Sequence, residues 1–104
     1  MFSGLFFLKD INKGVEEWKQ TKNAVLLDVR TEEEYEDYHI PGSLNLPLDE
    51  LDFIKEKIPV RDTAIFVHCL SGARSAEAEK FLAEKGYTRV KNIGGINSYR
   101  GQTV

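Results

Sequence analysis

The sequence predicts an α/β fold in which a parallel β-sheet of four to five strands is flanked by α-helices on both faces. Two observations support this prediction. Short apolar runs alternate along the chain with segments of helical period, as they do in successive β-α-β units. Two of these runs, NAVLLDV and TAIFVHC, are almost continuously apolar, which is typical of strands that are covered on both faces.

Length and composition limit the classes of protein to be considered. We expect residues 1–104 to form a single domain, because this length suits one hydrophobic core. The formal net charge of −3 gives no reason to expect nucleic acid or an anionic membrane as a partner. The single cysteine cannot form an internal disulfide, which fits a reducing compartment such as the cytoplasm. The apolar start, MFSGLFFLKD, lacks the basic region of a signal peptide and the length of a membrane span.

The first part of the chain is expected to supply two strands and two helices. Residues 5–8 predict a strand, and INKGVEEWKQ places Ile11 and Val15 on one side of a short helix. NAVLLDV, the first continuous apolar run, is the next strand. TEEEYEDYH then predicts one or two helical turns, because Thr31 can cap the helix and Glu34 can reach back to it in a capping box.

The middle of the chain contains a short strand and a helix. Pro41 and Gly42 end the preceding helix with a turn, and SLNLPL is a short strand that Pro47 stops. DELDFIKEKI predicts a helix, with Asp49 as its cap and Pro59 as its end.

The last part of the chain repeats the alternation. TAIFVHC predicts a buried strand that ends at Cys69, and SAEAEKFLAEKG predicts an amphipathic helix that stops at Gly86. RVKNIGG supplies the last strand, and INSYRG a terminal turn of helix. We expect Gly94 and Gly95 to let the backbone turn near the functional edge of the sheet, since no dinucleotide-binding glycine pattern surrounds them.

Polar and reactive side chains are predicted to meet at one edge of the sheet. Asp28 and Arg30 lie where one continuous apolar strand ends, and Cys69 lies where the other ends. In parallel α/β sheets, ligands bind beyond the carboxyl ends of the strands. This edge is therefore the predicted functional site. For Asp28 and Arg30, a structural ion pair, a backbone anchor and a substrate contact all remain open.

The residues after Cys69 predict a reactive thiol. A buried free cysteine is usually inert packing, but here the short loop CLSGARS joins the strand directly to a helix. Gly72 permits a positive φ, and such turns direct successive N–H groups inward as an anion-binding nest. The helix start adds unpaired N–H donors, and Arg74 adds a cation. These groups favour the thiolate and lower the pKa of a cysteine thiol.

Three stretches in order, LLDVRTEEEYEDYHIPGSLNLPL, FVHCLSGARSAEAEKFLAEKGY and VKNIGGINSYRG, resemble the single-domain rhodaneses over residues 5–101. The resemblance implies a sulfurtransferase. Cys69 would take a sulfane sulfur from a donor, thiosulfate or a persulfide, and become a persulfide. A thiophilic acceptor would then remove that sulfur: cyanide in vitro, a cellular thiol, or a protein sulfur acceptor. The implied reaction needs no cofactor and no metal, and two histidines with one cysteine make a metal site improbable.

The expected site comprises Cys69 as the catalytic nucleophile and the loop after it as the substrate-binding segment. The loop amides would cradle the transferred sulfur, Arg74 would close the loop and attract an anionic donor, and Ser75 would stabilise the loop or cap the helix. The substrate-binding residues are thus Leu70, Ser71, Gly72, Ala73, Arg74 and Ser75.

Other interpretations remain open. Phosphatases and arsenate reductases of the thiolate class have a loop one residue longer than the one that joins Cys69 to Arg74. A non-catalytic rhodanese-like binding module and a persulfide carrier for a partner enzyme are further alternatives. Leu70 and Ser71 are neutral where certain thiosulfate-using members are basic, so thiosulfate could be only a substitute donor. His68 is expected to point away from the thiol as a structural side chain, and His39 to fasten the adjacent turn.

Overall fold

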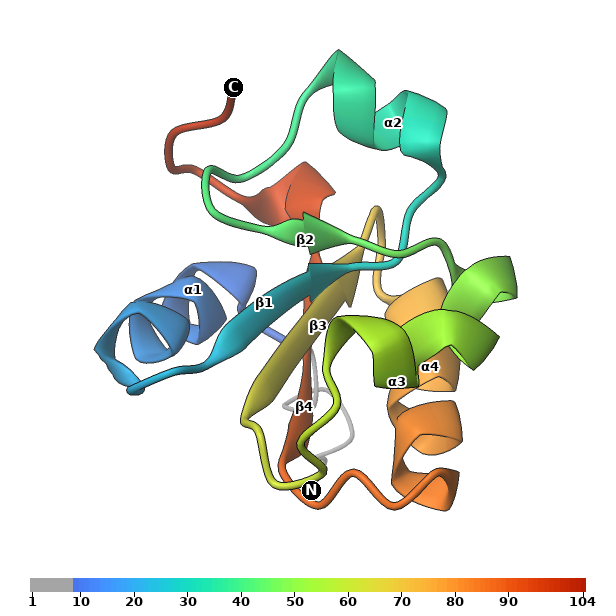
Figure 1. Cartoon of the computed structure of the whole chain (residues 1–104). Coiled ribbons are helices and arrows are strands. Elements are labelled where there is room, and N and C mark those ends of the chain that lie inside the picture. Colours follow the sequence, from blue (N-terminus) through green and yellow to red (C-terminus); the bar gives the residue numbers. More distant parts are fainter. Residues whose placement is uncertain (1–8) are drawn as a thin grey trace, which may run out of the picture.

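Helices alternate with parallel strands along the chain in the computed structural model, which describes residues 9–104 (Figure 1). The strand predicted at residues 5–8 lies outside the described residues. The elements, in order, are α1 (Ile11–Gln20), β1 (Val25–Asp28), α2 (Glu32–Asp37), β2 (Leu44–Asn45), the 3-10 helix η2 (Leu48–Phe53), α3 (Ile54–Lys57), β3 (Ile65–Cys69), α4 (Ala73–Glu84), β4 (Val90–Gly95) and the 3-10 turn η3 (Ile96–Ser98).

The four strands within residues 9–104 form one parallel sheet in the order β2-β1-β3-β4. The two continuous apolar strands, β1 and β3, lie side by side in its centre, as their composition predicts. The register between β3 and β4 shifts after Val67, so that Cys69 ends beside Gly95. The last residue of β3 therefore faces the glycine pair of the last strand.

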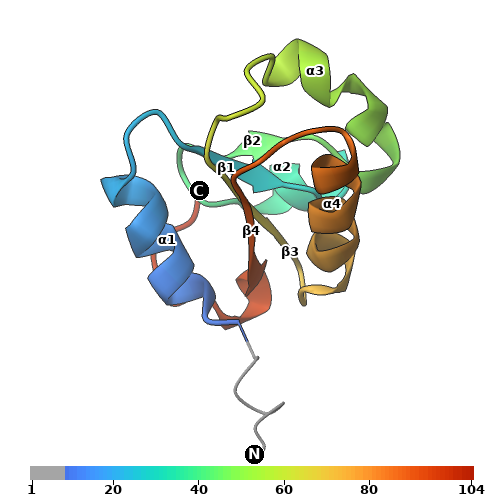
Figure 2. The same ribbon diagram turned by 90° about the horizontal axis from the view of Figure 1, so that it is seen from below.

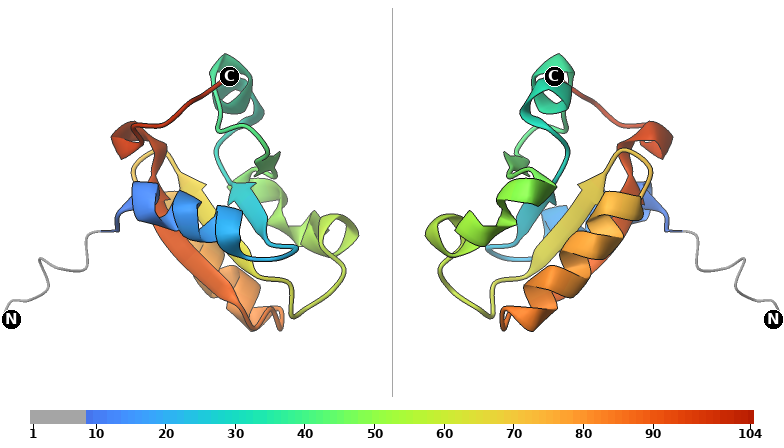
Figure 3. Two further views of the ribbon diagram at one scale, coloured as in Figure 1. Left: turned by 90° about the vertical axis from the view of Figure 1, so that its left-hand side faces the viewer. Right: turned by 90° about the vertical axis from the view of Figure 1, so that its right-hand side faces the viewer.

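Helices cover both faces of the sheet, which confirms the predicted fold class. Figure 2 shows α1 on one side of β4 and α4 on the other, and the two views of Figure 3 show the same layers from opposite sides. One buried cluster joins Leu27, Val67 and Cys69 to residues of η2, α3 and α4, and a second joins Leu26 and Phe66 to α1. Because neighbouring strand residues alternate between these clusters, Cys69 belongs to the layer that contains α4.

The starts of two helices follow the expected chemistry. Thr31 and Glu34 form the predicted capping box: the Thr31 hydroxyl accepts the Glu34 N–H, and the Glu34 carboxylate accepts the Thr31 N–H. Helix α4 begins at Ala73, directly after Gly72, whose φ of +108° lies in the left-handed region that favours glycine. This backbone turn brings the helix start under the end of β3.

The helix predicted over DELDFIKEKI is present, but the predicted cap, Asp49, is wrong. The segment is a 3-10 helix followed by one turn of α-helix, and the position before it is occupied by Pro47 without a side-chain cap. Leu48, Leu51 and Ile54 are spaced three residues apart, and Leu51 and Ile54 are buried. A 3-10 helix has three residues per turn, so it keeps these side chains on one face better than an α-helix with 3.6 residues per turn. Asp49 therefore lies within the first turn and caps nothing.

No helix within residues 9–104 is long and apolar enough to span a membrane.

Candidate active site

The two central strands bring their last residues together at one edge of the sheet, as predicted. Asp28 pairs in register with His68, and the Val29 N–H donates to the His68 carbonyl at 3.1 Å. Cys69, the end of β3, lies one residue further along. Helix α2 lies above this edge of the sheet (Figure 1).

The sulfur of Cys69 has hydrocarbon on one side and hydrogen-bond donors on the other. The residue is 1% exposed and belongs to the buried cluster beneath α4. Its Sγ accepts the backbone N–H of Gly72 at 3.0 Å and that of Ser75 at 3.3 Å. The Ser75 hydroxyl lies 3.4 Å from the same Sγ. The loop thus curls around the sulfur and directs its amides at it, as an anion-binding nest does.

These contacts decide the charge of the thiol. Burial alone would raise the pKa of Cys69, but it is outweighed by hydrogen bonds from the Ser75 hydroxyl and from the backbone N–H groups of Ser75, Gly72 and Ser71. The net result is a pKa below the ordinary thiol value. The thiolate is the reactive form of cysteine, so these contacts make Cys69 more reactive than an ordinary thiol.

Ser75 holds the loop as well as the sulfur. Its side chain is fully buried, and its hydroxyl lies within hydrogen-bonding distance of two carbonyl oxygens, 3.1 Å from that of Gly72 and 3.4 Å from that of Gly94. It therefore links the loop, the start of α4 and β4. These contacts suit the loop-stabilising role that we predict for Ser75.

The glycine pair of β4 lets the loop lie directly against the sheet. A Cβ at Gly95 would come within 2.6 Å of the Ser71 Cα, and the Asn97 N–H donates to the Leu70 carbonyl at 3.1 Å. The backbone of the last strand thus supports the loop from behind. The sequence indicates the glycines, but not the close approach that requires Gly95.

Asp28 and Arg30 form a buried ion pair, and Arg30 also anchors the backbone, so two of the roles left open by the sequence are present together. Arg30 Nε and Nη2 approach the Asp28 carboxylate at 2.8–3.1 Å, and both side chains are at most 1% exposed. Arg30 Nη2 also donates to the Tyr38 carbonyl at 2.7 Å. The pair ties the end of β1 to the chain after α2, and neither residue contacts the sulfur-binding loop through a described hydrogen bond.

The two histidines make contacts that suit the structural roles predicted for them. His68 is fully buried, and burial lowers its pKa, which keeps the ring neutral. His68 Nδ1 lies 3.3 Å from the Cys69 carbonyl oxygen, and Nε2 lies 3.7 Å from Asp28 without a hydrogen bond. His39 stacks on Tyr35 and hydrogen bonds to its carbonyl oxygen at 2.8 Å, so it fastens α2 to the turn that follows.

Arg74 is paired with Glu34, which we predicted from the sequence only as part of the capping box of α2. Its two terminal nitrogens donate to the two carboxylate oxygens of Glu34, at 2.7 and 3.0 Å. The remaining loop side chains, those of Leu70, Ser71 and Ala73, are exposed and uncharged. Sequence reasoning missed Glu34 as a member of the site because 40 residues separate it from Arg74. No local signal could have found it, because its position three residues after Thr31 predicts only the helix cap.

The structure offers no cluster of three or more histidine, cysteine, aspartate or glutamate side chains that could hold a metal ion within residues 9–104.

Comparisons with known proteins show the family of this chain. The family model for the rhodanese-like domain matches residues 10–102. The chain is 38% identical over 71 residues to the thiosulfate sulfurtransferase PspE of Escherichia coli, covering 67% of this chain and 68% of that protein. It is 39% identical over 77 residues to a sulfurtransferase of Allochromatium vinosum, covering 73% of this chain and 71% of that protein.

The solved structures show the same fold. A rhodanese from E. coli, solved with anions, superposes with a TM-score of 0.72 at 34% sequence identity. The match covers 78% of this chain and 96% of that one. Together, the relatives confirm the predicted class of enzyme, a rhodanese-type transferase. With a family match along nearly all of the described residues and a cysteine loop at the expected edge of the sheet, the chain belongs to the rhodanese-like domain family.

Proposed function

We propose that this sulfurtransferase carries a sulfane sulfur on Cys69 as a persulfide. The observation that supports the proposal best is the pair of backbone N–H groups, from Gly72 and Ser75, that donate to Sγ at 3.0 and 3.3 Å. These donors favour the attacking thiolate. After the transfer, the loop amides would hold the negative terminal sulfur, as an oxyanion hole holds oxygen.

The proposed cycle has two steps, and one thiol is enough for both. In the first step the Cys69 thiolate attacks the outer sulfur of the donor, a new S–S bond forms, and the donor's S–S bond breaks. Its electron pair leaves with the remaining fragment, which is sulfite when the donor is thiosulfate. In the second step cyanide or a thiolate attacks the terminal sulfur of the persulfide, carries it away as thiocyanate or a new persulfide, and returns the Cys69 thiolate.

The substrate-binding role that we assign to residues 70–75 rests on their backbone rather than on their side chains. Leu70 and Ser71 lie exposed beside the buried sulfur, where an acceptor could approach. A small thiol or a protein acceptor could meet the loop from that side. We expect the cycle to run in a reducing compartment such as the cytoplasm, which would keep the single thiol reduced.

The contacts of Arg74 favour sulfur transfer over phosphate chemistry. A phosphatase of the thiolate class uses its loop arginine to hold the phosphate oxygens, which carry the charge of the transition state. Here both terminal nitrogens of Arg74 are held by Glu34. The short loop also encloses a single sulfur atom closely, through Gly72 and Ser75.

Intact-mass analysis tests the proposal. Wild-type protein incubated with thiosulfate or an organic persulfide is expected to gain the mass of one sulfur atom, and cyanide should remove it as thiocyanate. Cys69→Ser should gain nothing. Absence of a mass gain with both donors would overturn the proposal. A stable gain that small acceptors fail to discharge would indicate a carrier that hands its sulfur to a partner protein.

A further inference from the structure

The one arginine of the sulfur-binding loop is already neutralised by a carboxylate. Arg74 and Glu34 form a two-bond ion pair, and about a third of each side chain is exposed, 34% and 29%. Bidentate pairs of this kind are the strongest and most directional between arginine and carboxylates. A donor that needed the full charge of Arg74 would have to displace Glu34 first.

Glu34 is also fixed from its other side. Its Oε1 accepts the Thr31 N–H at 2.9 Å and the Thr31 hydroxyl at 3.1 Å, in the capping box of α2. The hydrogen bond from Arg74, with those from Thr31, lowers the pKa of Glu34 to about 2. The same carboxylate raises the pKa of Arg74. Both partners are therefore charged and preorganised at every pH near neutrality.

The loop offers little other positive charge to an anionic donor. Leu70, Ser71, Gly72 and Ala73 are uncharged. Among the described residues near the loop, Lys9 is a second cation, but it lines a separate hollow, with Ser71, Gly72 and the glycine pair of β4. The pair of Arg74 and Glu34 thus presents no net positive charge to an anionic donor that passes it.

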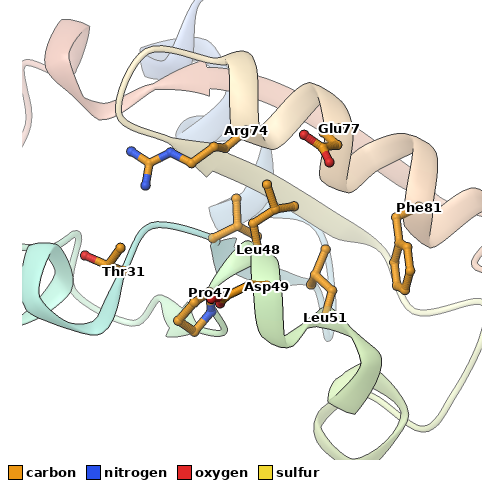
Figure 4. Close-up of a pocket in the computed structure, with 9 residues that line it drawn as sticks. Thr31, Pro47, Leu48, Asp49, Leu51, Arg74, Glu77 and Phe81 are labelled. Carbon is orange, nitrogen blue, oxygen red and sulfur yellow. The ribbon is translucent and has the colours of Figure 1, made fainter.

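A mostly apolar pocket of about 410 Å³ opens beside Arg74, on the layer of the sheet that contains Cys69. Figure 4 shows that it runs between η2 and α4, with Arg74 and Thr31 near one end and Phe81 at the other. Its charged lining residues besides Arg74 are the acidic Asp49 and Glu77. Its hydrocarbon lining consists of Val29, Pro47, Leu48, Leu51 and Phe81. Such a pocket suits a carbon body and repels a dianion.

We propose that Glu34 is a specificity-determining residue that biases the Cys69 loop against thiosulfate and towards an organic persulfide. This inference rests on the proposed function. The donor R–S–SH places its carbon body in the pocket beside Arg74 and its outer sulfur at Cys69. The Cys69 thiolate attacks that outer sulfur, which keeps its proton, and the donor's S–S bond breaks. The products are the Cys69 persulfide and R–S⁻, so atoms, charge and electrons balance without another reactant.

The test compares two charge-neutral substitutions on the same helix. Glu34→Gln keeps an oxygen for the capping box but removes the charge that neutralises Arg74. Glu33→Gln is the matched control. Glu33 is exposed, and its substitution removes the same formal charge as Glu34→Gln does. The probes are thiosulfate and benzyl persulfide, generated in situ, with kcat/KM measured for each. Thermal melting establishes that both variants are folded.

We expect the wild type to use benzyl persulfide with the higher kcat/KM. Glu34→Gln should raise kcat/KM for thiosulfate by about three- to tenfold, and should change that for benzyl persulfide by less than about twofold. Glu33→Gln should change either value by less than about twofold. For the wild type, added salt should not depress thiosulfate use, since the approach past Arg74 carries no net positive charge.

Several results would overturn the inference. They are a wild-type preference for thiosulfate, equal effects of the two substitutions, or a steep fall of wild-type thiosulfate turnover with salt. If Lys9→Gln lost thiosulfate turnover while Glu34→Gln gained none, thiosulfate would be assigned to the hollow beside Lys9 and not to the approach past Arg74. All of these results differ from failure of the proposed function. If that function were wrong, neither donor would add sulfur to Cys69.

Discussion

Arg30 folds back onto Asp28, two residues earlier, and the pair lies buried where the central strand β1 ends. Three nitrogen–oxygen contacts of 2.8–3.1 Å join the two side chains, and a fourth bond joins Arg30 to the Tyr38 carbonyl. A buried pair of this kind does little for stability compared with hydrocarbon, but loss of one partner leaves an uncompensated charge. The edge of the sheet beside Cys69 therefore depends on both residues.

The first prediction concerns this ion pair. Asp28→Asn should lower the free energy of unfolding by about 3–5 kcal/mol, because it strands the buried Arg30 guanidinium. Glu17→Gln is the matched control: it removes one partner of the exposed pair between Glu17 and Lys91, and should cost at most about 0.5 kcal/mol. Denaturant unfolding measures both. Equal losses in the two variants would contradict the structural role assigned to Asp28.

The second prediction concerns the charge of the thiol. Because hydrogen bonds hold the pKa of Cys69 below its ordinary value, the rate of alkylation should rise with pH around a midpoint that lies below that of an ordinary cysteine thiol. Ser75→Ala removes the hydroxyl bond, so it should move that pKa upward and slow alkylation at neutral pH by about threefold or more. Ser71→Ala leaves the backbone donor of Ser71 in place and should keep the wild-type profile. A wild-type midpoint above the ordinary thiol value would be decisive against an activated Cys69.

The third prediction concerns the close approach of β4 to the loop. The φ of Gly95 is −122°, so its backbone is ordinary, but a Cβ would meet the Ser71 Cα. Gly95→Ala should therefore destabilise the protein by about 1–3 kcal/mol and slow persulfide formation at least about tenfold. Gly86→Ala provides the control, since Gly86 has a φ of +96° and lies at the far end of α4, where a Cβ would meet the Arg61 side chain at an ordinary contact distance of 3.7 Å. It should cost about 1 kcal/mol of stability and leave the rate unchanged. Normal sulfur loading by folded Gly95→Ala would show that the loop tolerates displacement.

The fourth prediction concerns stability in acid. The pKa of Glu34 is lowered from its ordinary 4.5 to about 2, chiefly by Arg74. A carboxyl whose pKa is lower in the folded state stabilises the protein above its unfolded pKa, and that contribution disappears as the pH falls through the folded pKa. The Glu34 contribution should thus be complete above about pH 5 and vanish towards pH 2. Glu34→Gln should flatten this part of the stability curve relative to Glu33→Gln, which denaturation at several pH values measures.

The sequence predicts the sheet well because the relevant signals are local. The continuous apolar runs that end at Asp28 and Cys69 identify the two central strands, and the capping box of Thr31 identifies the start of α2. The segment before Pro59 is the exception. Its apolar residues fit both helical periods over so short a length, and packing on the sheet decides in favour of the 3-10 form.

The site is predicted only as far as its residues are neighbours in sequence. The loop from Cys69 to Ser75 carries its glycine, its helix start and its serine within seven positions, so its chemistry can be read directly. The pairing of Arg74 with Glu34 is a tertiary contact, and no local pattern specifies which carboxylate meets the arginine. The contact of Gly95 with the loop is likewise visible only once β3 and β4 are aligned.

The support that β4 gives to the loop has a consequence for protein synthesis. Ser75 reaches the Gly94 carbonyl, and the Asn97 N–H holds the Leu70 carbonyl, so the nest around the sulfur is complete only with the last strand in place. While the ribosome is still making that strand, Cys69 has already been translated, but its loop lacks the support of β4. We therefore expect the nascent chain to carry an ordinary thiol, which becomes reactive towards sulfur only once β4 has joined the sheet.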